Sequence, residues 1–214
     1  LTYRPGIVEF PPVEDPVSGT EDTVDAHFGE DLHTEGDSVR LESYPKTEQA
    51  RAKFLADLVN PQTVDFEEFE HDSRPQVLDF GETTATLSYT TGDLIVKTLN
   101  EGATSPWFPT SGNNYLLSRN HTEFTIEFSE PQSAFGLNMT DAENGPFSMT
   151  LHRENGTTKN VIIPVEANHI DFSGSALFFG VKDMEQPFNA VTIYRPTHDG
   201  RTGLDELVIG EIKQ

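Results

Sequence analysis

The sequence predicts an all-β protein: an antiparallel two-sheet, jelly-roll-like sandwich with one short peripheral helix and an extended acidic N-terminal arm. Three observations support this fold class. From residue 63 onward, apolar and polar residues alternate in short runs, as in strands that bury one face. Turn signals such as Asn155-Gly156 separate the runs. The 15 Phe, 16 Gly and 14 Pro suit short strands joined by turns, while the strand order stays open.

Residues 1–46 are predicted to form the arm. Residues 1–49 contain 12 acidic and 3 basic residues, and few apolar residues in periodic order. Such a composition buries too little apolar surface to offset the loss of chain entropy. The start of the arm is different because it holds four residues that favour strands: Tyr3, Ile7, Val8 and Phe10. This segment could add as a strand to a sheet edge, in the same molecule or in a neighbouring copy.

Residues 47–214 are predicted to form the sandwich domain, which begins with a helix over residues 47–59. Thr47 is expected to cap the helix, and Asn60-Pro61 to end it. Three apolar residues recur at a spacing of four and share one helix face: Ala50, Phe54 and Leu58.

Eleven strands are predicted after the helix, from alternating residues and from the turns between them. The clearest is Glu123–Ser129, where three apolar residues alternate with polar ones. The strands are Thr63–Phe69, Thr83–Thr90, Asp93–Leu99, Tyr115–Arg119, Glu123–Ser129, Ala134–Met139, Phe147–Arg153, Asn160–Val165, Ala176–Val181, Ala190–Tyr194 and Glu206–Ile212.

An ordered set of short motifs runs from the helix to the last strand. The motifs are Phe54-Leu55-Ala56-Asp57-Leu58, Val64-Asp65-Phe66-Glu67, Phe124-Thr125-Ile126-Glu127-Phe128, Ala134-Phe135-Gly136-Leu137 with Thr140-Asp141, Leu177-Phe178-Phe179-Gly180-Val181 and Leu204-Asp205-Glu206-Leu207-Val208-Ile209-Gly210. Through these motifs, residues 47–210 resemble a recurring secreted bacterial β-sandwich domain, often found in proteins with a PEP-CTERM-type sorting tail. The resemblance implies a jelly-roll sandwich like those of carbohydrate-binding modules, a secreted or cell-surface location and no established chemistry.

Composition excludes several classes of function. The formal net charge of −22 argues against nucleic acids and anionic membranes as partners, because both would be repelled. No apolar run approaches the roughly 20 residues that span a bilayer. Cysteine is absent, and the seven His residues form no His-Glu-x-x-His pattern. Gly-x-Ser-x-Gly is also absent. A non-enzyme is therefore predicted, with a polysaccharide lyase or hydrolase as the alternative.

The best candidate metal site joins acids of the first and last core strands. Asp65 and Glu67 lie on the first of these strands, and Asp205 and Glu206 on the last. If the two strands are neighbours, their carboxylates could supply the hard oxygen ligands that a structural Ca²⁺ prefers. The alternative is that these acids form a solvated face. A second acidic run, residues 141–145, lacks EF-hand spacing and is interpreted as a turn.

The candidate ligand-binding segment is the aromatic loop over residues 105–115. It contains the single Trp of the chain between two prolines. A stiff aromatic face with polar donors beside it suits a sugar ring. The predicted contacts are Trp107, Phe108, Asn113, Asn114 and Tyr115. The alternative is that Trp107 and Phe108 plug one end of the sandwich.

Three sequons, at Asn120, Asn138 and Asn155, are candidate glycosylation sites. Taken together, the sequence predicts a non-catalytic extracellular recognition module that binds a glycan or matrix polymer, or that mediates adhesion. The alternative is a structural subunit of an extracellular filament or matrix, whose copies assemble by donating the N-terminal strand.

Overall fold

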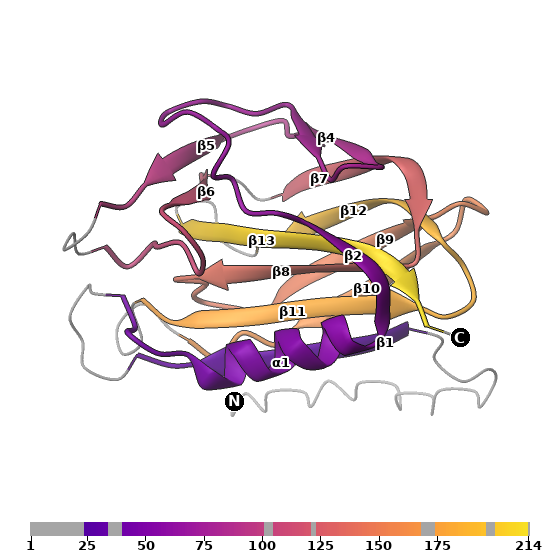
Figure 1. The fold of residues 1–214 in the computed structure, drawn as a ribbon, viewed down its shortest axis with the longest axis horizontal. Helices are drawn as coiled ribbons and strands as arrows, with labels where there is room; N and C mark the ends of the chain where they lie inside the picture. The colour runs from indigo at the N-terminus through magenta and orange to yellow at the C-terminus, as the bar shows by residue number, and fades with distance from the viewer. Residues whose placement is uncertain are drawn as a thin grey trace, which may run out of the picture.

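The computed structural model describes residues 24–33, 40–100, 105–120, 123–167, 174–195 and 200–213. In these ranges two antiparallel sheets pack face to face, with one helix on the outside (Figure 1). One sheet has the strand order β1-β11-β8-β13-β6-β5, with β2 also paired to β13. The other has the order β10-β9-β12-β7-β4-β3. The predicted jelly-roll-like sandwich is confirmed. Within the described ranges, no helix is long and apolar enough to span a membrane.

The elements follow one another along the chain with these bounds: β1 (Val24–Asp31), α1 (Pro45–Ala56), β2 (Leu58–Val64), β3 (Val77–Asp79), β4 (Thr84–Ser88), β5 (Asp93–Thr98), β6 (Asn114–Arg119), β7 (Glu123–Gln132), β8 (Ala134–Thr140), β9 (Phe147–Arg153), β10 (Thr158–Ile163), β11 (Ala176–Asp183), β12 (Phe188–Tyr194) and β13 (Arg201–Ile212).

The main core lies between the two sheets. Phe124, Ile126 and Phe128 all point into it from β7, as the alternation predicts. Strands β8 and β11 are buried at every position. Their outer face is covered because Phe54 of α1 packs there in one cluster, and the loop around Phe108 packs in another. The seven-stranded sheet is therefore enclosed on both faces at its centre.

Helix α1 begins at Pro45, two residues before the predicted start, and proline occupies its first turn. Thr47 does not cap the helix. Its hydroxyl lies 2.9 Å from both Asp31 Oδ2 and the carbonyl oxygen of Ala176, which ties α1 to β1 and β11. The helix ends at Ala56, and Asn60-Pro61 lies in β2. Pairing of β2 with β13 thus overrides the helical pattern of the last residues.

The assignment of Val24–Asp31 to an extended arm is wrong. This segment is β1, the edge strand that pairs antiparallel with β11 (Figure 1). Val24 and Phe28 pack against the main core, so the segment buries apolar surface despite its acidic composition. The four residues of the proposed assembly strand, Tyr3, Ile7, Val8 and Phe10, lie outside the described residues.

Candidate functional site

The aromatic loop packs across the outer face of the seven-stranded sheet. Phe108 is 1% exposed, and its backbone N–H donates to Thr140 Oγ1 at 3.2 Å. Tyr115 is also buried in the same outer cluster. Phe108 and Tyr115 are therefore core residues on the outer face of the sheet, and the loop does not plug an end of the sandwich. Trp107 is half-buried, and the guanidinium carbon of Arg201 lies 5.0 Å from the centroid of its indole ring.

The two asparagines of this loop hold another part of the chain. Glu67 Oε1 accepts hydrogen bonds from the backbone N–H groups of Asn113 at 2.7 Å and Asn114 at 2.5 Å. The side-chain amide of Asn114 donates to the carbonyl oxygens of Phe66 and Phe69. Glu67, a predicted metal ligand, is thus hydrogen-bonded to Asn113 and Asn114, two residues predicted to contact a sugar. Asn114 is buried and serves this contact, whereas Asn113 is exposed.

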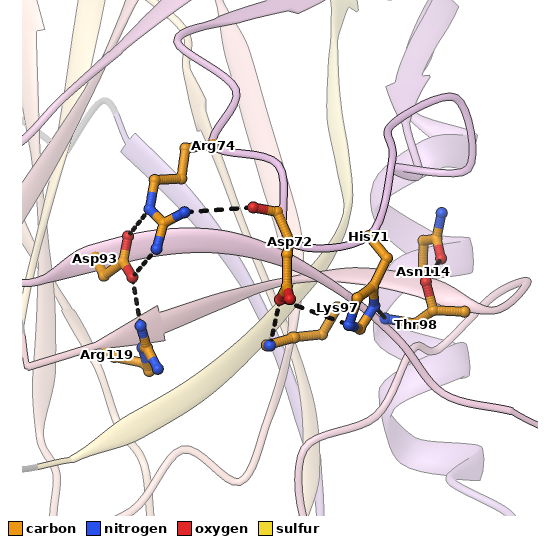
Figure 2. A network of polar contacts seen from close by, with 8 residues as sticks. All are labelled: His71, Asp72, Arg74, Asp93, Lys97, Thr98, Asn114 and Arg119. Carbon is orange, nitrogen blue, oxygen red and sulfur yellow. Dashed lines mark hydrogen bonds and ion pairs between the residues drawn. The ribbon is translucent and has the colours of Figure 1, made fainter.

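A polar network continues from Asn114 along strand β5 (Figure 2). Asp93 accepts hydrogen bonds from Arg74 at 2.7 and 3.0 Å and from Arg119. Asp72 forms an ion pair with Lys97 at 2.5 Å. The Arg74 and Arg119 guanidinium groups hold the pKa of Asp93 below its usual value. The contacts that complete the network are those of His71 with Thr98 and of Thr98 with Asn114. The network fixes the segment after β2 to the outer edge of the sheet.

The predicted neighbours, the first and last strands of the sandwich domain, do pair: β2 lies beside β13. The acidic side chains on and beside these two strands nevertheless bond to different parts of the chain. Asp65 is exposed and accepts a hydrogen bond from the backbone N–H of Glu67 at 3.2 Å. Asp205 is 1% exposed, and its Oδ2 accepts the backbone N–H groups of Thr110 at 2.8 Å and Ser111 at 2.9 Å. Burial raises the pKa of Asp205 to about 7, although these N–H donors oppose the shift.

Glu206 lies at a bulge of β13 with a φ of 47°, which directs its side chain toward α1. Its Oε1 lies 2.9 Å from Arg51 Nη2, and its Oε2 accepts the side-chain amide of Asn138 at 2.6 Å. A guanidinium group thus neutralises this carboxylate. Calcium binding by Asp65, Glu67, Asp205 and Glu206 stays a prediction.

Among the described residues, one group of three or more His, Asp or Glu side chains brings its ligand atoms within 4.8 Å of one another. It consists of Asp25, His27 and Asp57, none of which the sequence singled out as a ligand. Lys182 Nζ lies 2.8 Å from Asp25 and 2.5 Å from Asp57. The buried ammonium pairs with both carboxylates, so this cluster is an ion-pair network that joins β1, the C-terminal end of α1 and β11.

The three sequons differ in access. Asn155 lies in the exposed turn between β9 and β10, where the predicted hairpin is confirmed. Asn120 is also exposed. Asn138 is 2% exposed on β8, and its amide donates to Thr110 Oγ1 at 2.8 Å and to Glu206. The prediction of a glycan on Asn138 is therefore wrong for the folded protein, because the acceptor nitrogen is buried and bonded.

A cavity of about 210 Å³ opens beside the indole of Trp107. Four chain segments build it: the aromatic loop, the turn after β8, the residue that follows β12 and the start of β13. Its lining residues are Trp107, Asp141, Glu143, Asn144, Arg195, Gly200 and Arg201. We call it the Trp107 cavity. The acidic run 141–145, interpreted from the sequence as a turn, thus contributes three of the residues that line the Trp107 cavity.

Arg195 is the residue that sequence analysis missed. It is 6% exposed, its guanidinium stacks at 5.5 Å on the ring of Phe147, and its Nη2 donates to Thr202 Oγ1. Burial lowers its pKa to about 10, opposed by the charges of Asp141 and Glu143. Within the described part of the chain, Arg195 Nη1 and Trp107 Nε1 are buried atoms without a hydrogen-bond partner.

The two acids of the cavity form a pair. Asp141 Oδ1 accepts the backbone N–H of Gly174 at 2.6 Å, which fixes its carboxylate. Burial, with the charge and hydrogen bond of Asp141, raises the pKa of Glu143 to about 8. At neutral pH the pair therefore retains a proton and carries about one negative charge.

The sequence matches no protein-family profile and no curated protein. Among solved structures, it is similar to the K2 cleaved adhesin domain of Lys-gingipain, with 10% identity over 70% of this chain and 97% of that one and a TM-score of 0.44. The C-terminal family 22 carbohydrate-binding module of Clostridium thermocellum Xyn10B shows 15% identity over 67% and 92%, with a TM-score of 0.35. A single-substitution mutant of the CBM29-2 module shows 13% identity over 58% and 91%, with a TM-score of 0.33. Similarities at this level carry no argument about function, which depends on the residues of this chain.

Proposed function

We propose that the protein is a non-catalytic recognition module, secreted or at the cell surface, that binds carbohydrate through the Trp107 cavity. One observation carries the proposal: the half-buried indole of Trp107 forms a wall of this cavity, and its Nε1 lacks an acceptor within the described residues. A buried indole N–H usually finds a hydrogen-bond partner. A sugar supplies both parts of what is missing, an oxygen acceptor for the N–H and an apolar ring face for the indole.

The size of the cavity supports a small, directed contact. Its volume of about 210 Å³ is below the roughly 300–1,000 Å³ of pockets that enclose drug-sized ligands. It suits one sugar unit, with the rest of a chain outside. Asn144 is exposed and lines the rim of the cavity. The chemistry of the lining is therefore aromatic on one side and polar on the others.

The acid pair of the cavity does not suit glycoside hydrolysis. Retaining glycosidases hold their two carboxyl groups about 5–5.5 Å apart, and inverting enzymes about 6.5–9.5 Å. Asp141 and Glu143 instead share a hydrogen bond, which leaves no space between them for a glycosidic bond or a water. We therefore assign the pair a binding role.

The test uses the fact that the chain contains a single Trp. Its fluorescence reports directly from the cavity, so a panel of soluble polysaccharides can be titrated against the full chain. We expect at least one polymer to change the emission and to release or absorb heat in calorimetry. Trp107→Ala should abolish the calorimetric signal, whereas Tyr89→Ala, an exposed aromatic outside the cavity, should retain it. A panel in which no polymer gives either signal would overturn the proposal.

The filament alternative stays a prediction, since the strand that it would donate lies outside the described residues. The PEP-CTERM resemblance likewise stays a prediction.

A further inference from the structure

Two nitrogen atoms of the Trp107 cavity define what kind of atom its ligand must present. Arg195 Nη1 and Trp107 Nε1 are both buried, and neither has a partner in the described ranges. An indole and a guanidinium can only donate hydrogen bonds. A buried donor without an acceptor is destabilising, so a ligand that supplies acceptors at both positions recovers a substantial free energy. The missing atoms are therefore oxygens with free lone pairs.

The charges in the cavity favour an anionic oxygen. Two guanidinium groups, those of Arg195 and Arg201, line it together with one acid pair. Asp141 and Glu143 share a proton at neutral pH, and Asp141 is already bonded to the backbone N–H of Gly174. The cationic groups are consequently in excess. Arg195 is also more than nine-tenths buried, and in such surroundings a charged hydrogen bond is stronger than at the surface.

From these contacts we infer that the ligand carries a carboxylate, as the uronic acid units of acidic polysaccharides do. The inference rests on the proposed carbohydrate-binding function and names the class of sugar. A carboxylate offers two coplanar acceptor oxygens, which match the planar fork of a guanidinium group. Arg195 Nη1 and Trp107 Nε1 donate to oxygens of this sugar unit, Arg201 pairs with its carboxylate, and the sugar ring lies against the indole of Trp107.

Access to the indole ring face requires one local movement, because Arg201 lies over this face. Arg195 already lines the cavity beside Gly200, which packs so closely against it that a Cβ at this position would meet Nη1 at 2.8 Å. Arg201 is exposed, so its side chain can swing off the indole and turn its guanidinium toward the entering carboxylate. The ring face that Arg201 leaves is then free for the sugar.

The overall charge of −22 does not prevent this binding. At physiological ionic strength, charges are screened over about 8 Å, so distant surface acids act weakly on a ligand that is already in contact with the cavity. The two arginines act at hydrogen-bond distance and are screened much less. Recognition is therefore local, and the acidic surface slows the approach of the polymer without setting the contact energy.

The experiment compares oligogalacturonate with the neutral galacto-oligosaccharide of the same length, using Trp107 fluorescence and calorimetry on the full chain. A sulfated galactan serves as the second anionic probe. We expect oligogalacturonate to bind at least about tenfold more tightly than either of the other two. Arg201→Gln should weaken this binding about tenfold, while Arg40→Gln, the same charge change at an exposed position outside the cavity, should leave it unchanged. Trp107→Phe keeps the ring, removes the N–H donor and should reduce the heat of binding.

The results of this comparison separate the two proposals. Tighter binding of the neutral oligosaccharide overturns the carboxylate inference and leaves the carbohydrate-binding function intact. Tighter binding of the sulfated galactan overturns it in favour of a sulfate ligand. Equal effects of Arg201→Gln and Arg40→Gln would show that net charge, and not the cavity, attracts the uronate. If none of the three probes binds but the wider polysaccharide panel contains a ligand, only the carboxylate inference fails.

Discussion

The substitution Asn138→Asp tests whether the centre of β8 is as closed as the structure indicates. The Asn138 amide donates to Thr110 Oγ1 at 2.8 Å and to Glu206 Oε2 at 2.6 Å, and the residue is 2% exposed. The substitution replaces this donor with a carboxyl group directly beside the Glu206 carboxylate. The new acid must either lose its proton and repel Glu206 or retain the proton against its ordinary pKa.

The loss of stability in Asn138→Asp depends on whether the introduced acid is protonated or ionised. At pH 5 the introduced carboxyl group can retain its proton at about 1.4 kcal/mol per pH unit above its ordinary pKa of about 3.9, and can still donate to Glu206. With the lost Thr110 contact, worth about 1 kcal/mol, the destabilisation is about 2–3 kcal/mol. At pH 8 protonation becomes far more expensive, and ionisation places a second, buried carboxylate beside that of Glu206, which Arg51 already pairs. The destabilisation then rises to about 4–6 kcal/mol.

The assay is thermal unfolding at pH 5 and pH 8, followed by circular dichroism. For a protein of this length, 1 kcal/mol shifts the melting temperature by roughly 2–4 °C. We expect a loss of about 5–10 °C at pH 5 and about 10–20 °C at pH 8. Asn155→Asp is the matched control, since Asn155 is exposed and an acid can still accept the N–H of Thr157. Equal melting of the two variants, or a loss that does not grow with pH, would refute the reasoning.

Three further outcomes are expected. Phe54→Ala empties a fully buried site between α1 and the sheet, and should cost about 3–5 kcal/mol in chemical denaturation. The affinity for uronate should fall as the pH rises through about 8. Ionised Glu143 beside Asp141 then adds a negative charge, which offsets the attraction of Arg195 and Arg201 for the ligand. Glu143→Gln should show a flat pH profile in the same titration. EDTA should leave the melting temperature unchanged, because protein donors already bond three acids of the predicted calcium site, Glu67, Asp205 and Glu206; a loss that Ca²⁺ restores would instead support the metal.

Much of the fold could be predicted from local pattern, and the errors have physical causes. Alternation correctly located β7, where apolar side chains face the core at every second residue. The same rule failed at Thr63–Phe69, where the strand ends at Val64. Phe66 adopts a φ of 63°, and the rings of Phe66 and Phe69 meet at 6.0 Å in a turn. An apolar spacing that arises in a turn cannot be distinguished locally from a strand.

Strand β1 was missed for a different reason. Its acids suggested a segment unable to bury surface, yet these polar residues have partners far along the chain. Asp25 contacts Lys182 at 2.8 Å, and Glu30 accepts the backbone N–H of Glu166 at 2.9 Å. Composition alone cannot indicate that a charged residue will be paired after folding. An acidic edge strand is therefore hard to separate from an acidic tail.

The candidate site was only partly visible in the sequence. The aromatic loop and the acidic run 141–145 were each noted, but their meeting depends on Phe108 packing against Thr140 at the end of β8. Arg195 gave no signal, because arginine is usually exposed and nothing in its neighbourhood marks it as buried. Its partner is Thr202, seven residues later in the chain. Long-range packing, not any local motif, assembles the cavity.

The acids that suggested calcium and the loop that suggested sugar binding belong to one structural unit. Glu67 accepts the backbone N–H groups of Asn113 and Asn114, while Asp205 accepts those of Thr110 and Ser111. Two carboxylates thereby fix the loop that carries Trp107 on both sides of Gly112. A loop held in this way loses little conformational entropy when a ligand binds, so more of the contact energy remains as affinity. Under the proposed function, these acids are positioning residues that hold the loop and do not contact the ligand themselves.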